Sequence, residues 1–246
     1  MRIYLMLALF VINLAVLAAE EIPNSVTDGL KRVLKTDFDK VSSITPTPIA
    51  GLYEVMIGSQ VIYVSADGNY LVLGEIQDTV TGKNLTDEKR NELRKQAINA
   101  LSDSEMVVFV PEKDTKHTIN VFTDVDCQYC AKFHQEVSKL NEDGVKVRYL
   151  AFPRAGIGSK TYKTMRSVWC ASNRQQAMTD AKSRREIKEE KCNNPIKKQY
   201  ELGQRLGVTG TPALVLSDGT LVPGYLPAER LIFFLENPEY LDRIRR

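Results

Sequence analysis

The chain has 246 residues, of which 43% are hydrophobic and 26% are charged, and its formal net charge is +2. These proportions are typical of a folded protein with a buried core and exclude a disordered chain. A net charge so close to zero gives no sign of a polyanion-binding surface, so we expect no nucleic-acid partner. The densest basic run, residues 182–185, is followed at once by acids, which is typical of a solvated helix face.

The N-terminus has the layout of an export signal. Arg2 precedes an apolar run over residues 3–19, which ends in the small residues Ala18 and Ala19. A charged start, an apolar centre and a small-residue cleavage site predict a signal peptide at residues 1–19. An uncleaved anchor helix is the alternative, because the run is only slightly shorter than the ~20 residues that span a membrane. We favour cleavage and export to an oxidising compartment, where disulfides persist.

Residues 20–82 predict a small N-terminal α+β domain. Apolar residues recur at helical spacing over residues 22–38, with Asn24 or Ser25 as the expected N-cap. Closely spaced prolines then force extended backbone over residues 43–48. Three strand-like pieces follow at 52–57, 61–65 and 70–76, with hairpin-type turns between them. A unit this small is only marginally stable by itself, so we expect it to need a partner such as a second copy.

Residues 83–103 predict a helix that links two domains. Thr86 is the expected N-cap, and the acids Asp87 and Glu88 lie where the helix dipole favours negative charge. The apolar stripe is narrow and the other faces are charged, which is typical of a spacer helix between two domains.

Residues 104–246 predict a second, α/β domain. Strands are expected at 106–110, 117–124 and 145–152, with a helix after the first two. A helical region at about 159–206, broken at 193–195, precedes a strand at 212–217, a second short strand and a helix that starts at Pro227. A strand, a CxxC pair, a helix, a strand, inserted helices, a hairpin and a final helix are the order of a thioredoxin-like fold.

Cys127 and Cys130, in the stretch VFTDVDCQYCAKFH, form the CxxC pair. A haem tether needs histidine at the next position, which is Ala131, and the other two cysteines are too far apart for a typical zinc site. We therefore expect no metal and no cofactor. The pair opens a helix, whose N-terminal partial charge favours thiolate, so we predict Cys127 as the nucleophile and Cys130 as a less exposed resolving thiol. A purely structural bridge between them is the alternative.

Four other residues receive weaker predictions. For an exported chain, Cys170 and Cys192 are expected to form a structural disulfide rather than two free thiols. His134 has no partner pattern and is expected on a solvent-facing side of its helix. Pro212 precedes a strand, where proline serves as an edge or turn device.

Several motifs together resemble the DsbC/DsbG family of periplasmic thiol–disulfide isomerases, and DsbC more closely. They are GLYEV (51–55), YVSADGNYLVLGE (63–75), NLT (84–86), FTDVDCQYC (122–130), VRYLAFPR (147–154), WC (169–170) and LGVTGTPALVLSDGTLVPGY (206–225). The resemblance implies a V-shaped homodimer, in which a small cystatin-like N-terminal domain dimerises and a linker helix carries the thioredoxin-like domain. It also implies a cis Thr211–Pro212 bond facing the CxxC pair, a Cys170–Cys192 bridge and a periplasmic location.

The function that this resemblance implies is isomerisation of wrong disulfides in exported proteins. Cys127 and Cys130 would be catalytic, with Gln128, Tyr129, Thr211 and Pro212 at the substrate, and a membrane thiol reductase of the DsbD type would recycle the pair. The dipeptide Gln128-Tyr129 departs from the Gly-Tyr usual in the isomerase, which alters hydrogen bonding to the thiolate and hence the redox potential. A dithiol oxidase and a holdase chaperone are the alternative functions.

Overall fold

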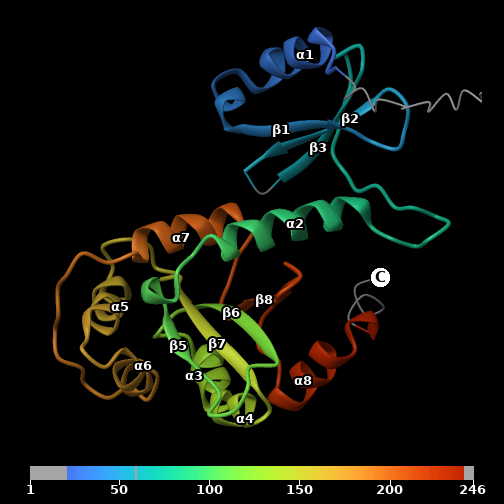
Figure 1. Ribbon diagram of the computed structural model, residues 1–246. Coiled ribbons are helices and arrows are strands. Elements are labelled where there is room, and N and C mark those ends of the chain that lie inside the picture. The colour runs from blue at the N-terminus through green and yellow to red at the C-terminus, as the bar shows by residue number, and fades with distance from the viewer. Residues whose placement is uncertain (1–20, 59, 241–246) are drawn as a thin grey trace, which may run out of the picture.

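The computed structural model describes residues 21–58 and 60–240, so the predicted signal peptide lies outside the described residues. A smaller N-terminal domain and a larger thioredoxin-like domain are joined through helix α2 (Leu85–Asn99), as Figure 1 shows. The predicted mixed α/β class with a thioredoxin-like domain is confirmed. Within residues 21–58 and 60–240, no helix combines the length and the apolar character that crossing a membrane requires.

The N-terminal domain is one helix packed on an antiparallel sheet. Its strands lie side by side in the order β1-β2-β3-β4. Its elements are α1 (Asn24–Leu34), the 3₁₀ helix η1 (Lys35–Lys40), β1 (Val41–Pro46), β2 (Leu52–Ile57), β3 (Gln60–Ser65) and β4 (Leu71–Val72). Two of the predicted strands are confirmed, whereas the piece predicted at 70–76 forms only the short β4. The proline-containing segment that was predicted to be extended pairs with β2 as strand β1.

Helix α1 is held to the sheet by apolar packing and by one hydroxyl. Val26 and Leu30 are buried against Val55 and other sheet residues. The predicted capping by Asn24 or Ser25 is wrong, because Pro23 occupies the N-cap position and no side chain caps the helix. Ser25 Oγ instead donates to the Ala66 carbonyl at 2.5 Å, which ties the helix to the turn after β3.

The thioredoxin-like domain has a five-stranded sheet in the order β5-β7-β6-β8-β9. Strands β6 and β7 are parallel and the other pairs are antiparallel. The elements up to the insertion are η2 (Asp103–Glu105), β5 (Val107–Phe109), β6 (His117–Thr123), α3 (Gln128–Gln135), α4 (Val137–Glu142) and β7 (Val145–Ala151). The later elements are α5 (Lys160–Cys170), α6 (Arg174–Lys182), α7 (Ile196–Arg205), β8 (Ala213–Val215), β9 (Leu221–Pro223) and α8 (Ala228–Glu236).

Both faces of this sheet are covered by helices. Helices α3 and α4 lie on one face, and α2 and α7 lie on the other (Figure 1). Successive residues of a strand point to opposite faces. Tyr149 of β7 accordingly joins the core beside α3 and α4, while its neighbour Leu150 joins the core beside α2 and α7. The central strands are therefore nearly continuous apolar runs, as is usual for a sheet buried on both sides.

The inserted helical region is more broken than predicted. Besides the expected break near Pro195, the chain leaves helical structure between α5 and α6 and again from residue 183 to residue 195. Cys170 at the end of α5 is joined to Cys192 in this irregular segment by a disulfide, with the Cα atoms 5.6 Å apart. The disulfide fixes a segment that has no sheet or helix to hold it.

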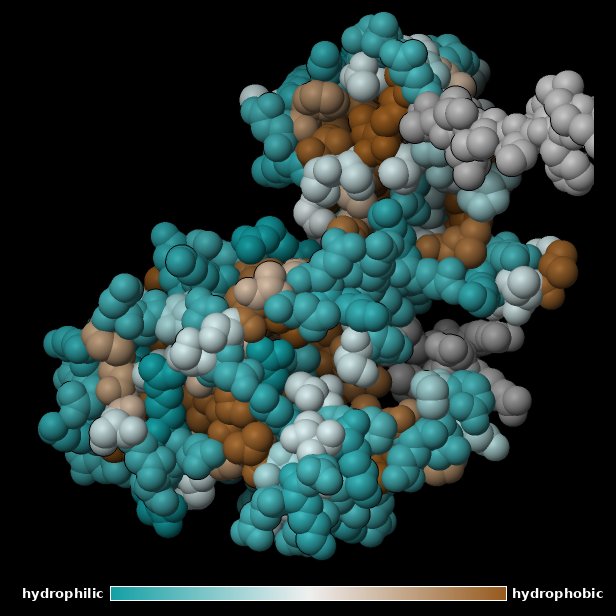
Figure 2. All heavy atoms as spheres, in the orientation of Figure 1, coloured by the Kyte–Doolittle hydropathy of each residue, from teal (hydrophilic) through white to brown (hydrophobic). Residues whose placement is uncertain are grey.

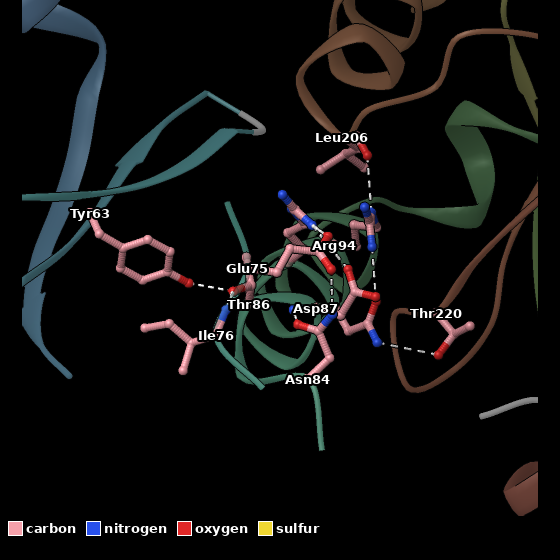
Figure 3. Close-up of polar contacts among 11 residues, drawn as sticks. Tyr63, Glu75, Ile76, Asn84, Thr86, Asp87, Arg94, Leu206 and Thr220 are labelled. Carbon is pink, nitrogen blue, oxygen red and sulfur yellow. Dashed lines mark hydrogen bonds and ion pairs between the residues drawn. The ribbon is translucent and has the colours of Figure 1, made fainter. Parts of the chain in front are cut away.

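The N-cap of the linker helix is a different residue from the one predicted. Asn84 occupies the N-cap, and its side chain accepts from the Asp87 amide at 3.0 Å, so the prediction of Thr86 is wrong. Thr86 is fully buried, where its hydroxyl bonds the Tyr63 hydroxyl and accepts from the Ile76 amide (Figure 3). Thr86 therefore ties α2 to the N-terminal domain.

The other end of α2 is docked on the thioredoxin-like domain. Arg94 Nε donates to the Leu206 carbonyl at 3.0 Å, and Asn91 Nδ2 donates to Thr220 Oγ1 at 3.4 Å (Figure 3). Ile98 is buried in the core beside α7. The predicted linker helix is therefore bonded to both of the domains that it joins.

Helix α2 packs closely against the backbone of Gly219. The φ of this glycine is +91°, and a Cβ built on it would lie 1.8 Å from the Asn91 carbonyl oxygen. We expect Gly219→Ala to reduce the free energy of unfolding by about 2–4 kcal/mol, through backbone strain and overlap with α2. Urea denaturation measures this, with Gly74→Ala as the control, since a Cβ there meets no neighbour within 4 Å. Equal losses in the two variants would contradict the docking of α2.

The disulfide gives a second prediction. Replacing both Cys170 and Cys192 by alanine removes a cross-link between residues 22 apart in sequence. In the chain-entropy account this lowers the free energy of unfolding by about 3 kcal/mol. Urea denaturation of the double variant and of reduced wild type should show the same loss, and an unchanged midpoint in both would contradict a structural role.

Candidate active site

The loop between β6 and α3 is held rigid by one buried carboxylate. Asp124 follows the last residue of β6 and is 2% exposed. Its two oxygens accept from the Asp126 amide at 2.8 Å, from the Arg154 amide at 2.9 Å and from Arg154 Nε at 3.1 Å. These bonds fix the backbone immediately before the CxxC pair.

Cys127 is the N-cap of α3. Its backbone is extended, with φ −82° and ψ 120°, and its sulfur accepts from the Cys130 amide at 3.3 Å. The first amides of a helix have no partner within the helix, and the helix dipole is positive at this end. Cys127 Sγ therefore lies where a negative charge is stabilised.

Thr211 and Pro212 lie beside the cysteine pair although they are more than 80 residues away in sequence. Their peptide bond is cis, and the Thr211 carbonyl oxygen lies 3.2 Å from Cys127 Sγ, where it accepts from the sulfur in its protonated form only. The Thr211 hydroxyl is buried with no hydrogen-bond partner of normal length among the described residues. Pro212 is buried, and its carbonyl accepts from the Gly224 amide at 2.8 Å, which anchors this turn to the chain after β9.

Both cysteines are buried. Cys127 is 3% exposed and Cys130 is 1% exposed, so the order of exposure is the predicted one although the difference is small. The two sulfurs differ in whether a reactant can reach them, because Cys127 lines an open hollow of about 540 Å³ together with Gln128 and Tyr129. Both of those side chains are exposed, Tyr129 by 62%. A reacting sulfur would reach Cys127 through this hollow.

The pKa values of the two thiols are displaced in opposite directions. A hydrogen bond from the Cys130 thiol is the largest influence on Cys127 and lowers its pKa to about 5, against the opposing effect of burial. Thr211, the Cys130 amide and the charge of Arg154 lower it further. Burial raises the pKa of Cys130 well above its usual range, and its hydrogen bond to Cys127 raises it too. At neutral pH the first sulfur is thiolate and the second is thiol.

His134 does not face solvent as predicted. Its Nδ1 lies 3.0 Å from the Tyr149 hydroxyl and its Nε2 lies 3.0 Å from Thr179 Oγ1, so both ring nitrogens have partners. Burial, with a smaller effect from Lys182, lowers the pKa of His134 to about 4. The ring is therefore neutral at pH 7 and adds no positive charge to Cys127.

Lys182 is a residue near the site that sequence analysis missed. It belongs to the basic run that was predicted to form a solvated helix face, yet it is 5% exposed and lines the same hollow as Cys127. No local pattern distinguishes it from its exposed neighbours Arg184 and Arg185. Within residues 21–58 and 60–240, no three histidine, cysteine, aspartate or glutamate side chains lie close enough to hold a metal ion.

Comparison with known proteins agrees with this geometry. Residues 16–87 match the family described as disulfide bond isomerase protein N-terminal domain, and residues 104–237 match the thioredoxin-like domain family. The thiol:disulfide interchange protein DsbC of Escherichia coli (strain K12) is 42% identical over 80% of this chain and 82% of its own length. The chain belongs to the DsbC family.

Two further relatives support the assignment to the DsbC family. The DsbC protein of Dickeya dadantii is 35% identical over 91% of this chain and 92% of its own length. The crystal structure of a disulfide interchange protein from Neisseria gonorrhoeae has a TM-score of 0.50 and 27% identity, over 56% of this chain and 98% of that one. The predicted thiol:disulfide interchange enzyme is therefore confirmed, and membership of the DsbC family favours isomerase over the oxidase and holdase alternatives.

The displaced pKa values predict how Cys127 reacts with an alkylating agent. Because the reagent attacks thiolate, we expect the rate at Cys127 to reach half its maximum near pH 5 and to stay constant above pH 7. Cys130→Ala removes the thiol that donates to Cys127 and should move this midpoint to higher pH. Cys127→Ser is the control and should lose the fast reaction. A midpoint near pH 8 or above in wild type would contradict the site geometry.

Proposed function

We propose that this chain corrects wrong disulfides in exported proteins by nucleophilic attack of Cys127. The observation that supports this function is the position of Cys127, whose sulfur caps α3 and has a pKa of about 5. Cys127 also lines a hollow through which a client can approach. Its thiolate attacks one sulfur of a client disulfide and forms a mixed disulfide, while the other client sulfur leaves as thiolate. A different client thiolate then attacks the mixed disulfide, which restores Cys127 and leaves the client re-paired. No net electrons are exchanged in this cycle.

Cys130 provides the exit when the client does not re-pair. It lies one helical turn from Cys127 and is buried, with a pKa raised by that burial. Because its thiol is held protonated, it attacks the mixed disulfide slowly, which gives the client time to rearrange. When it does attack, the client leaves reduced and the enzyme is left with a Cys127–Cys130 disulfide. A membrane thiol reductase of the DsbD type would then restore the dithiol.

The substrate contacts in this proposal surround Cys127. Gln128 and Tyr129 border the hollow and offer an amide and an aromatic ring to the client. Thr211 and Pro212 lie beside Cys127, with the Thr211 carbonyl oxygen 3.2 Å from Cys127 Sγ. An extended client segment would bond this backbone as an added strand would.

We include a homodimer formed through the N-terminal domain. This domain is small, and several of its apolar side chains are exposed, such as Tyr70, Val72 and Leu73. Apolar surface is visible on the domain beneath α1 in Figure 2. An exposed apolar patch on a small domain is a usual dimerisation surface. Because α2 is bonded to both domains, two such chains would present their Cys127 sites in a fixed geometry, with space for an unfolded client.

Location in the periplasm completes the proposal. An oxidising compartment is where clients acquire wrong disulfides, and a Cys170–Cys192 bridge persists there. Export by a cleaved signal peptide would deliver the chain to that compartment.

Refolding of a scrambled multi-disulfide client tests the function. Wild type should restore the native pairing, Cys127→Ser should not, and Cys130→Ala should accumulate a mixed disulfide because the exit step is removed. A reduced client provides the control, since an oxidase forms bonds in it but does not rearrange a scrambled one. Suppression of aggregation by Cys127→Ala on a cysteine-free client measures any holdase activity. Wild type that oxidises the reduced client and never rearranges the scrambled one would contradict isomerisation.

A further inference from the structure

Lys182 is a buried ammonium group next to the CxxC pair. It is the last residue of α6 and is 5% exposed. Its Nζ donates to Thr123 Oγ1 at 2.6 Å and to the Asp124 carbonyl at 2.7 Å, and both distances are typical of a charged donor. These two acceptors lie at the end of β6, immediately before the loop that leads to Cys127. The inserted helices thus place a positive charge beneath the redox site.

Burying a lysine is energetically unfavourable if the side chain only holds this loop in place. Moving an ammonium group out of water costs several kcal/mol, and a neutral side chain of similar size often stabilises the fold as well or better. The Thr123 hydroxyl and the Asp124 carbonyl, which accept from Lys182, are both neutral. The charge itself therefore needs a negative partner that is present during the working cycle.

The charged groups around Lys182 identify that partner. Burial lowers the pKa of Lys182, while Cys130 raises it most, followed by Cys127 and then Asp124, and Arg154 lowers it. The Asp124 carboxylate is already paired with Arg154 at 3.1 Å.

From α3, His134 also faces Lys182, but this ring is neutral at pH 7 because burial and the lysine lower its pKa to about 4. Among these neighbours, the two sulfurs gain and lose negative charge as the enzyme turns over, and Cys130 couples to Lys182 more strongly than Cys127 does.

We propose that Lys182 is a positioning residue for the exit step, in which its buried charge stabilises the thiolate of Cys130 as that sulfur displaces a bound client. This inference rests on the proposed function for the identity of the client but not for the chemistry of the pair. Lys182 acts through Cys130 and does not itself contact the client sulfur.

The exit step balances without a further oxidant. The Cys130 thiolate attacks Cys127 Sγ of the mixed disulfide, so that the Cys127–Cys130 bond forms and the bond to the client sulfur breaks. The client sulfur leaves as thiolate with the bonding electron pair and takes up the proton that Cys130 released. The client is reduced and the enzyme pair is oxidised by two electrons. Lys182 stays protonated throughout and lowers the cost of the intermediate thiolate.

Two substitutions at Lys182 separate its charge from its hydrogen bonds. Lys182→Met removes both, whereas Lys182→Gln removes the charge and keeps an amide donor for Thr123 and Asp124. The matched control is Lys163→Met on α5, which makes the same change of net charge at an exposed position. Urea denaturation and the Cys170–Cys192 disulfide check that each variant is folded.

The first measurement is the rate at which Cys130 releases a model thiol held on Cys127 as a mixed disulfide. Because attack requires the Cys130 thiolate, we expect both Lys182 variants to release it about tenfold or more slowly than wild type at pH 7, corresponding to a pKa about one unit higher. The difference should shrink as pH rises and the thiolate forms without assistance. The Lys163→Met variant should behave as wild type.

The second measurement is the equilibrium of the pair with glutathione. In the reduced form the thiolate is that of Cys127, to which Lys182 also couples. The buried positive charge stabilises this thiolate and has no such effect on a neutral disulfide. Both Lys182 variants should therefore shift the equilibrium about tenfold toward the Cys127–Cys130 disulfide. Wild-type values in Lys182→Gln with altered values in Lys182→Met would overturn the proposal in favour of a hydrogen-bonding role, and wild-type values in both would leave Lys182 no part in the chemistry.

These readouts are independent of isomerase activity. If wild type fails to rearrange a scrambled client but the Lys182 variants still release the model thiol more slowly, the isomerase proposal fails and this inference stands. If wild type rearranges the client and the rate of release from Cys127 does not change in the variants, the inference alone is wrong.

Discussion

The thiol chemistry of this protein depends on a single hydrogen bond, which the Cys130 amide donates to Cys127 Sγ. It makes the nucleophilic sulfur the cap of α3, so the sulfur takes the place of the serine or aspartate oxygen that usually satisfies a helix N-terminus. Ionisation of Cys127 then strengthens the cap, because the positive end of the helix favours a negative acceptor. The same contact brings the Cys130 thiol close enough to donate to Cys127, which separates the two pKa values in opposite directions.

The buried charged side chains around this hydrogen bond each have a different role. The Asp124 carboxylate accepts from two backbone amides and pairs with Arg154, which fixes the loop and leaves the arginine near the sulfurs. Lys182 donates to the Thr123 hydroxyl and the Asp124 carbonyl, and its charge interacts with Cys130 more strongly than with the Asp124 carboxylate. In a buried environment such charges act strongly over short distances. The redox poise of the CxxC pair is therefore a property of the loop, the insertion and the helix together.

Helix α2 fixes the two domains relative to each other. Thr86 bonds the N-terminal domain, Arg94 bonds the Leu206 carbonyl, and the approach of Gly219 leaves no room for a side chain. A helix held at both ends transmits orientation, whereas a free spacer would let the domains move independently. In this thiol:disulfide interchange enzyme, that docking fixes where the nucleophile lies relative to the N-terminal domain.

Local pattern in the sequence was enough to predict the strands at 52–57 and 61–65, the strand that ends before the CxxC pair, and the thioredoxin-like order of elements. Those features depend on alternation and turn residues, which act over a few positions. The special position of Cys127 was also predictable, because a cysteine between a strand and a helix necessarily lies at a helix N-terminus.

Only the tertiary structure decided the role of residues whose partners are distant along the chain. Thr86 was expected to cap a helix and is instead a buried bridge to Tyr63, and His134 was expected in water but bonds Tyr149 and Thr179. Lys182 has the sequence surroundings of a solvated lysine, yet the fold carries the end of α6 beneath the cysteines. The reason is physical: periodicity reports which face of an element is apolar, but the environment of a polar side chain is set by what other segments bring to it.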